Sequence, residues 1–270
     1  MDPDTAIPVC YRHADRETRL GCTVCGRPIC IACMTPAPVG QRCPECAAPA
    51  KGIRPAGRQE RAPVSMVILG LAVGLFVLGT LVPAVGQQLF LTLAQHNLSV
   101  LAGDTYRLVG AGFLHAGLTH VLFNMWALGS FGPPLEREVG SVPYAGLYAA
   151  ALLWGAVAYL WLGPATGVAV GASGAIFGLF GAWTAAAVRS RHTPVGRAQL
   201  RQMLMLLAIN AALPIVVPQI AWQAHAGGFA AGFAVAALWG LLPARGAVTR
   251  WRAGIAWGVA ALAWGAALAA

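Results

Sequence analysis

Residues 171–188 read GASGAIFGLFGAWTAAAV, a stretch that is long enough for a helix and holds no ionised side chain. The chain has three long uncharged runs, which lie between Arg61 and Asp104, between Glu138 and Arg189, and between Arg201 and Arg245. Each run is longer than the ~20 apolar residues that span a bilayer core. The sequence therefore predicts an all-α membrane protein that crosses the bilayer several times.

The composition agrees with a membrane protein and argues against a nucleic-acid partner. Of the 270 residues, 58% are hydrophobic and 10% are charged, whereas soluble domains have about 25% charged residues. The formal charge of +9 comes from basic residues at the ends of the hydrophobic runs rather than on one soluble face. The first apolar run begins near Val64, too deep for the hydrophobic region of a signal peptide.

Seven membrane spans are predicted, and the charges between them predict their orientation. The spans cover approximately residues 64–86, 118–134, 143–162, 171–188, 199–217, 222–243 and 252–269. Residues 87–117 are less apolar and are predicted to form a long loop that can lie in the membrane interface. Arginines concentrate in loops 189–201 and 244–252, while loops 163–170 and 215–221 carry no charge. The positive-inside rule then places the N-terminus in the cytoplasm and the C-terminus outside, in a multi-pass protein of the cell membrane.

The first 50 residues hold all seven cysteines and predict a metal-binding module. The ligands form four pairs, Cys10-x-x-His13, Cys22-x-x-Cys25, Cys30-x-x-Cys33 and Cys43-x-x-Cys46. A two-residue gap lets one tight turn present two ligands to zinc, so eight ligands make two closed tetrahedral sites. A disulfide framework is the alternative, but seven is an odd number and the cytoplasm is reducing. So short a segment buries little apolar surface, and zinc must supply its folding energy.

This cysteine-rich module resembles a B-box-type zinc finger. Interleaved binding in that family would join Cys10 and His13 with Cys30 and Cys33, and Cys22 and Cys25 with Cys43 and Cys46. The last pair is Cys-Cys where many B-boxes have histidines. Neither zinc site has an open coordination position, so the expected role is protein-partner binding or regulation rather than catalysis.

Ser173 is the first polar residue that stands out within the spans. The segment Gly171-Ala172-Ser173-Gly174 opens the fourth span from its outer end. Its glycines leave the hydroxyl uncrowded, and a helix N-terminus offers unpaired N–H donors to an oxyanion. The same residue types also serve helix packing, since Gly174, Gly178 and Gly181 lie on one face and are expected to contact another helix. Alone, this motif fits a packing residue or a nucleophile.

His225 lies near the start of the sixth span, at a depth comparable to that of Ser173. Gly228 and Gly232 share its helical face, so a neighbouring helix can come close. No Asp or Glu follows Glu138, and no His-Glu-x-x-His motif occurs. The sequence therefore lacks the buried carboxylates that an aspartyl protease, an ion-coupled carrier or a Ser-His-Asp triad needs. A dyad of Ser173 with His225 as its base is what is left. A structural hydrogen bond is the alternative for this histidine.

His120 and Asn124 are four residues apart and so share one face of the second span. His115 lies just upstream. Neutral histidine and asparagine side chains are donors suited to a developing oxyanion. Hydrogen bonding between helices is the alternative for both residues.

Together these motifs resemble the rhomboid family of intramembrane serine proteases, over about residues 64–245. They are Tyr106-Arg107, His115, His120-x-x-x-Asn124, Gly132-x-x-x-Glu136-x-x-x-Gly140, Gly171-x-Ser173-Gly174 and His225-x-x-Gly228-x-x-x-Gly232. The resemblance implies a six-helix core with Ser173 as nucleophile, His225 as general base, and an oxyanion site of His120, Asn124 and the Ser173 N–H. It assigns structural positions to His115, Arg107, Glu136, Gly171, Gly174, Gly228 and Gly232. The seventh span matches a six-plus-one arrangement, and Tyr106 stands where the family usually has tryptophan.

The predicted organisation has four parts. They are a zinc-binding domain at 1–50, a basic linker at 51–63, a rhomboid core at 64–245 and an additional C-terminal transmembrane helix at 246–270. The expected function is cleavage of transmembrane segments of other membrane proteins, with two structural Zn²⁺ ions in the N-terminal domain and no cofactor for catalysis. The rivals are a non-catalytic rhomboid-like binder or chaperone, a solute channel or carrier, and a zinc-dependent docking protein with a membrane anchor.

Overall fold

The computed structural model describes residues 7–36, 40–47, 61–242 and 248–270. The chain divides into two compact units, Met1–Glu60 and Arg61–Ala270. Most of the predicted linker 51–63 and the loop arginine Arg245 lie outside the described residues. The predicted domain boundaries themselves stay a prediction.

The N-terminal unit is built from short elements around its cysteines. Strand β1 (Val9–Cys10) pairs antiparallel with β2 (His13–Glu17), and β3 (Thr35–Pro36) pairs antiparallel with β4 (Gln41–Arg42). A 3-10 turn, η2 (Ile31–Cys33), and a one-turn helix, α1 (Pro44–Ala47), complete the described part. Among its described residues, the fully buried core consists of Ile29 and five cysteines, Cys10, Cys22, Cys30, Cys33 and Cys43, with Tyr11, Leu20 and Met34 packed partly buried against it. This is little apolar burial for an independent domain, so the cysteines must contribute more than packing.

The second unit is almost entirely helical. Its helices are α2 (Pro63–Leu81), α3 (Pro83–Leu93), α4 (Asn97–Leu101), α5 (Arg107–Gly110), η3 (Ala111–Phe113), α6 (Leu118–Val139), α7 (Ser141–Leu162), α8 (Ser173–Arg189), α9 (Pro194–Val216), α10 (Trp222–Trp239) and α11 (Val248–Leu268). Two short strands, β5 (Gln95–His96) and β6 (Val168–Ala169), form one antiparallel pair. The all-α class predicted from the uncharged runs is confirmed.

A long helix stands in each of the seven predicted spans, namely α2 and α6 to α11. By length and composition, α2, α7 and α9 could each cross a membrane. A fourth crossing is counted if Arg107–Phe113 and Leu118–Val139, which are bent by 94°, form one span. The unit is therefore a polytopic membrane protein, and the number of seven crossings stays a prediction.

The first predicted span, 64–86, is longer than the helix that forms there. Helix α2 ends at Leu81, and Pro83 begins α3. Proline lacks an N–H and its ring blocks the preceding turn, whereas the first position of a new helix accepts it readily. The stretch 87–117, predicted as a loop, accordingly holds the rest of α3 together with α4, α5 and η3.

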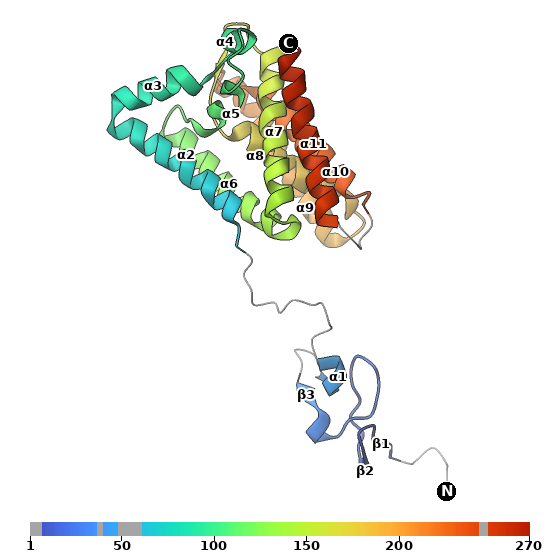
Figure 1. The fold of residues 1–270 in the computed structure, drawn as a ribbon. Helices are drawn as coiled ribbons and strands as arrows, with labels where there is room; N and C mark the ends of the chain where they lie inside the picture. Colours follow the sequence, from blue (N-terminus) through green and yellow to red (C-terminus); the bar gives the residue numbers. More distant parts are fainter. Residues whose placement is uncertain (1–6, 37–39, 48–60, 243–247) are drawn as a thin grey trace. The chain divides into compact units, whose positions relative to one another are not determined.

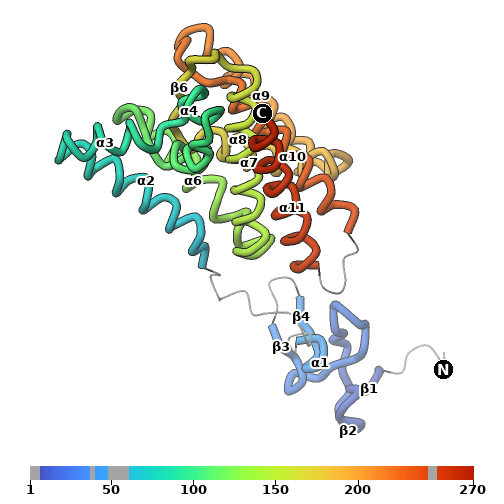
Figure 2. Tube along the Cα trace, turned by 45° about the horizontal axis from the view of Figure 1, so that its top comes forward, coloured from blue at the N-terminus to red at the C-terminus, as the bar shows by residue number. Residues whose placement is uncertain are grey.

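Helix α7 is central to the membrane unit. It packs against α8, α10 and α11, and α10 makes its most extensive contact with α8. In Figure 1, α7 and α11 run side by side, and Figure 2 shows α2 and α3 projecting as a V on another side of this unit. Helix α9 buries only Gly196 and Met203, so most of its surface is left for lipid or a partner.

Glycine lets the backbones of α8 and α10 approach each other closely. A Cβ on Gly228 would collide with the carbonyl oxygen of Gly174, and one on Gly232 would collide with that of Gly178. Gly155 of α7 joins this contact, because its Cβ would lie 2.8 Å from the Ala224 carbonyl oxygen. The expectation that the α8 glycines contact another helix is confirmed.

We predict that Gly232→Ala destabilises the membrane unit by about 1–3 kcal/mol, because the added methyl meets the backbone of α8 and the helices must separate. The measurement is thermal unfolding of the full chain in detergent. Gly258→Ala in α11 is the matched control, since nothing lies within 4 Å of a Cβ there. Equal melting temperatures for the two variants would contradict the close approach of α8 and α10.

Candidate active site

Ser173 and His225 meet where α8 and α10 approach each other closely through their glycines. Ser173 is the first residue of α8, and His225 lies in the first turn of α10. The two side chains are joined by a hydrogen bond of 2.9 Å between His225 Nε2 and Ser173 Oγ. The close backbones of α8 and α10 thus bring an imidazole to a hydroxyl at a helix N-terminus, where free N–H groups point outward.

The His225 ring is held in place by Phe177. Phe177 lies four residues after Ser173 on α8, and its ring stacks on the imidazole with centroids 4.1 Å apart and planes 10° apart. The stack fixes the plane of the imidazole while Nε2 faces Ser173. Phe177 was not among the predicted site residues, although its spacing of four from the serine places both residues on one helical face.

His120 approaches the serine through Gly171. A Cβ on Gly171 would lie 2.7 Å from both Cε1 and Nε2 of His120 and 3.8 Å from Ser173 Oγ. Gly171 also has φ of +125°, a conformation that other residues rarely adopt. Glycine at this position therefore serves both the turn into α8 and the approach of the imidazole to the serine.

Asn124 and His115 extend the polar side of α6. Asn124 Nδ2 donates to the His120 carbonyl oxygen at 2.9 Å, and its Oδ1 is buried without a partner among the described residues. The rings of His115 and His120 contact edge to face with centroids 5.0 Å apart. The predicted set of Ser173, His225, His120 and their neighbours is thus gathered at one end of α6, α8 and α10.

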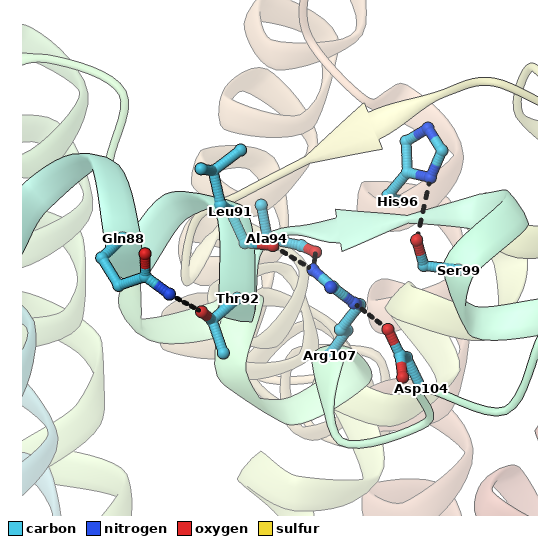
Figure 3. Close-up of polar contacts among 8 residues, drawn as sticks. All are labelled: Gln88, Leu91, Thr92, Ala94, His96, Ser99, Asp104 and Arg107. Carbon is cyan, nitrogen blue, oxygen red and sulfur yellow. Dashed lines mark hydrogen bonds and ion pairs between the residues drawn. The ribbon is translucent and has the colours of Figure 1, made fainter.

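Arg107 fixes the segment that leads to this site. Its Nη1 donates to the carbonyl oxygens of Leu91 at 2.8 Å and Ala94 at 3.1 Å, and its Nε donates to Asp104 Oδ2 at 3.0 Å (Figure 3). Arg107 therefore caps the C-terminal end of α3 and ties it to the turn before α5. Tyr106 lies beside it, half-exposed, with its ring 5.5 Å from the guanidinium carbon.

Glu136 lies at the opposite end of α6, 16 residues or ~24 Å along the helix from His120. It is 1% exposed and accepts four hydrogen bonds, from the backbone N–H groups of Val64 and Ser65 and from the hydroxyls of Ser65 and Ser141. The carboxylate thus satisfies donors at the N-termini of α2 and α7. A negative charge is favourable at a helix N-terminus, so Glu136 joins α2, α6 and α7 at the end of α6 away from His120.

The rhomboid domain family matches residues 102–241, which is more than half of the chain. The chain belongs to the rhomboid family. The putative rhomboid protease YdcA of Bacillus subtilis (strain 168) is 36% identical over 142 residues, 53% of this chain and 71% of that protein. The rhomboid protease GluP of the same organism is 35% identical over 148 residues, and RHOMBOID-like protein 1 of Arabidopsis thaliana is 37% identical over 131 residues. This chain spans only 29% and 33% of those two proteins.

The rhomboid match begins after the cysteine-rich unit, so the resemblance of that unit to a B-box stays a prediction. Two groups of side chains could hold a metal ion there, Cys10, His13, Cys30 and Cys33 in one and Cys22, Cys25, Cys43 and Cys46 in the other. Within each group all ligand atoms lie within 4.8 Å of one another. This grouping is the interleaved one that the resemblance implied.

The geometry of both groups fits a tetrahedral zinc ion. With Zn–S of ~2.3 Å and Zn–N of ~2.0 Å, tetrahedral ligands stand about 3.5–3.8 Å apart. His13 Nδ1 lies 3.8, 3.5 and 3.3 Å from the sulfurs of Cys10, Cys30 and Cys33. In the second group, the sulfurs of Cys25 and Cys43 are 3.8 Å apart. An all-sulfur and nitrogen donor set of this size suits zinc rather than a hard cation.

In the second group, hydrogen bonds favour the thiolate form of Cys22 and Cys25, whereas a hydrogen bond with Cys43 raises the pKa of Cys46. A hydrogen bond from the backbone N–H of Cys43 lowers the pKa of the Cys22 thiol to about 6. Arg27 lowers the pKa of Cys25, because its Nε donates to the sulfur at 3.3 Å. Arg27 is held in turn by Glu45, whose carboxylate lies 2.6 Å from its Nη2. Thiolates are the form that binds zinc, so the surroundings agree with the donor set.

We predict that Glu136→Gln lowers the stability of the rhomboid core by about 2–3 kcal/mol, because the amide nitrogen cannot accept the hydrogen bonds that the carboxylate accepts. The measurement is the melting temperature of the full chain in detergent. Glu138→Gln is the matched control, since Glu138 is exposed two residues further on the same helix. A melting temperature for Glu136→Gln as high as that of the control would contradict the joining role of Glu136.

Proposed function

We propose that this chain is an intramembrane serine endopeptidase in which Ser173 and His225 form a catalytic dyad. The observation that carries the proposal is the 2.9 Å hydrogen bond between Ser173 Oγ and His225 Nε2 at the end of α8. A hydroxyl is a weak nucleophile until a base takes its proton, and no carboxylate follows Glu138 in the sequence to assist. Membership of the rhomboid family and the protease names of two relatives support the same activity.

In the proposed reaction, Ser173 Oγ attacks the carbonyl carbon of a substrate peptide bond while its proton passes to His225 Nε2. The C–N bond then breaks, and the imidazolium returns the proton to the leaving amine. A water molecule then attacks the remaining ester and gives its proton to His225 Nε2. The bond between the acyl carbon and Ser173 Oγ breaks, and the imidazolium returns the proton to Ser173 Oγ. A transmembrane substrate must unwind first, because helical carbonyl groups are engaged in internal hydrogen bonds.

The oxyanion that forms during attack requires donors at the start of α8. The backbone N–H of Ser173 lies in the first turn of α8, where the helix supplies no acceptor. The imidazole of His120 lies beside Gly171, and Asn124 has a second amide hydrogen besides the one donated to the His120 carbonyl. We assign these three groups to the oxyanion site, where donors fixed before reaction stabilise developing charge.

A non-catalytic rhomboid-like binder or chaperone is the alternative function. A binder needs neither a hydroxyl nor a base, and it gains nothing from a Phe177 ring stacked to hold the imidazole against the serine. The bonded pair and the stack therefore favour the enzyme.

We predict that a fluorophosphonate probe labels the full chain in detergent and that Ser173→Ala abolishes the label. His225→Ala should slow labelling by about a hundredfold or more, because general-base catalysis contributes ~10²–10⁴ in rate. Ser130→Ala and His96→Ala are matched controls, since neither residue touches the dyad. Labelling that persists in Ser173→Ala, or wild-type protein that never labels, would leave the binder as the function.

We further propose that each cysteine-rich group holds one structural Zn²⁺, with Cys10, His13, Cys30 and Cys33 at the first and Cys22, Cys25, Cys43 and Cys46 at the second. Zinc at these positions would supply the folding energy that so small an apolar core cannot. With four protein ligands each, the sites have structural rather than catalytic character. We place this unit on the cytoplasmic side of the cell membrane, where it can bind a protein partner.

We predict about two zinc ions per chain by elemental analysis of the purified full-length protein, and fewer than two in Cys33→Ala. Removal of zinc in denaturant should expose seven reactive thiols, the number of cysteines in the sequence. Zinc-free protein that is still folded in this unit, or a thiol count far below seven, would favour a disulfide framework instead.

A further inference from the structure

A small cavity opens beside the nucleophile and is lined by a buried amide. Its walls include Ser173, Gly112, Leu152, Gly155, Ala224 and Gln95. Glycines and alanines make up much of this lining. Among the described residues, Gln95 and Ser173 are the two polar side chains that border the cavity. Gln95 is only 3% exposed, and it belongs to β5, which pairs with β6 directly before α8.

The orientation of the Gln95 amide is fixed by its neighbours. Its Nε2 donates to the Ala156 carbonyl oxygen at 2.9 Å and to Asn97 Oδ1 at 3.2 Å. Asn97 is fixed in turn, because its Nδ2 donates to the carbonyl oxygens of Tyr159 at 3.2 Å and Pro164 at 2.9 Å. Carbonyl oxygens only accept hydrogen bonds. A flip of either amide, which exchanges its oxygen and nitrogen, would therefore place the amide oxygen against a carbonyl oxygen.

This arrangement leaves Gln95 Oε1 as an acceptor without a donor. No group in the described part of the chain donates to it, and it is not among the fully enclosed orphan atoms. Since Gln95 lines the cavity, Oε1 is the polar atom that it can offer to a ligand there. Because Oε1 is open to the cavity, water can donate to it there. A ligand that fills the cavity without a donor displaces that water and leaves the acceptor unpaired, whereas a ligand with a donor keeps it bonded.

The size of the cavity restricts that ligand. Its volume is about 40 Å³, and one water occupies ~10–15 Å³ on the same scale. A side chain of two or three heavy atoms therefore fills the space. Serine, with one methylene and one hydroxyl, brings both the right size and a donor.

We propose that Gln95 is a specificity-determining residue that selects serine as the substrate residue immediately before the cleaved bond. The serine hydroxyl donates to Gln95 Oε1 while the peptide carbonyl stands at Ser173 Oγ. A site built to accept from a hydroxyl discriminates against an analogue without one, because its acceptor then stays unpaired. This inference rests on the proposed endopeptidase function.

The test compares peptide aldehydes that end in serine, 2-aminobutyrate or alanine and are otherwise identical. Each competes with fluorophosphonate labelling of Ser173 in the full-length protein in detergent. Serine and 2-aminobutyrate have the same size and differ by a hydroxyl in place of a methyl group. One neutral hydrogen bond is worth ~0.5–1.5 kcal/mol, so the serine aldehyde should compete about threefold to tenfold more strongly than the 2-aminobutyrate aldehyde. If the serine and 2-aminobutyrate aldehydes competed equally against the wild-type protein, that result alone would overturn the role of Gln95.

Gln95→Met removes the acceptor at nearly constant length, and it should bring the ratio of the serine to the 2-aminobutyrate aldehyde close to one. His96→Ala is the matched control, because the neighbouring side chain bonds to Ser99 and does not line the cavity. A purely structural role for Gln95 would weaken all three aldehydes alike, and a wild-type ratio in Gln95→Met would also overturn the proposal. Failure of the endopeptidase function itself would appear separately, as wild-type protein that no fluorophosphonate labels.

Discussion

The site depends on how closely two backbones can approach within a membrane. A serine and a histidine on neighbouring helices meet at 2.9 Å because Gly228 and Gly232 lie directly against the carbonyl groups of Gly174 and Gly178. Lipid is as apolar as leucine, so no hydrophobic effect pushes two such helices together. Close packing between backbones replaces that force. Any side chain larger than hydrogen at these positions would move the imidazole away from the hydroxyl.

Buried polar groups complete the scaffold where helices end. Glu136 accepts hydrogen bonds from donors at the N-termini of α2 and α7. Arg107 donates to a carbonyl group at the C-terminal end of α3, and Asn97 donates to a carbonyl group of α7. Each of these residues removes an unpaired backbone group that would be costly at membrane depth. Gln95 Oε1 differs from these groups, because no donor among the described residues reaches it, and Asn124 Oδ1 is likewise unpartnered at the same site.

The features that could be predicted from the sequence are those set by the spacing and type of residues, namely the long helices and the faces through which they touch. Uncharged runs located the long helices, and glycines spaced along α8 and α10 indicated which faces would touch. Which ligand pairs share one metal ion was predicted only from the resemblance to a B-box, because spacing alone allows several combinations of the four pairs. The first predicted span was too long because Pro83 begins a new helix inside an apolar run that is otherwise uninterrupted. Gln95 and Phe177 were missed because their meaning comes from tertiary contacts, an amide beside a cavity and a ring against an imidazole.

The decisive measurement is the distance between Ser173 Oγ and His225 Nε2 in an electron cryomicroscopy structure of the full chain in a lipid nanodisc. We expect the two atoms within hydrogen-bonding distance, about 3 Å apart, with the backbones of α8 and α10 in contact at Gly174 and Gly228. If another residue or lipid separated the two side chains, and α8 and α10 stood apart at these glycines, Ser173 and His225 could not form the dyad.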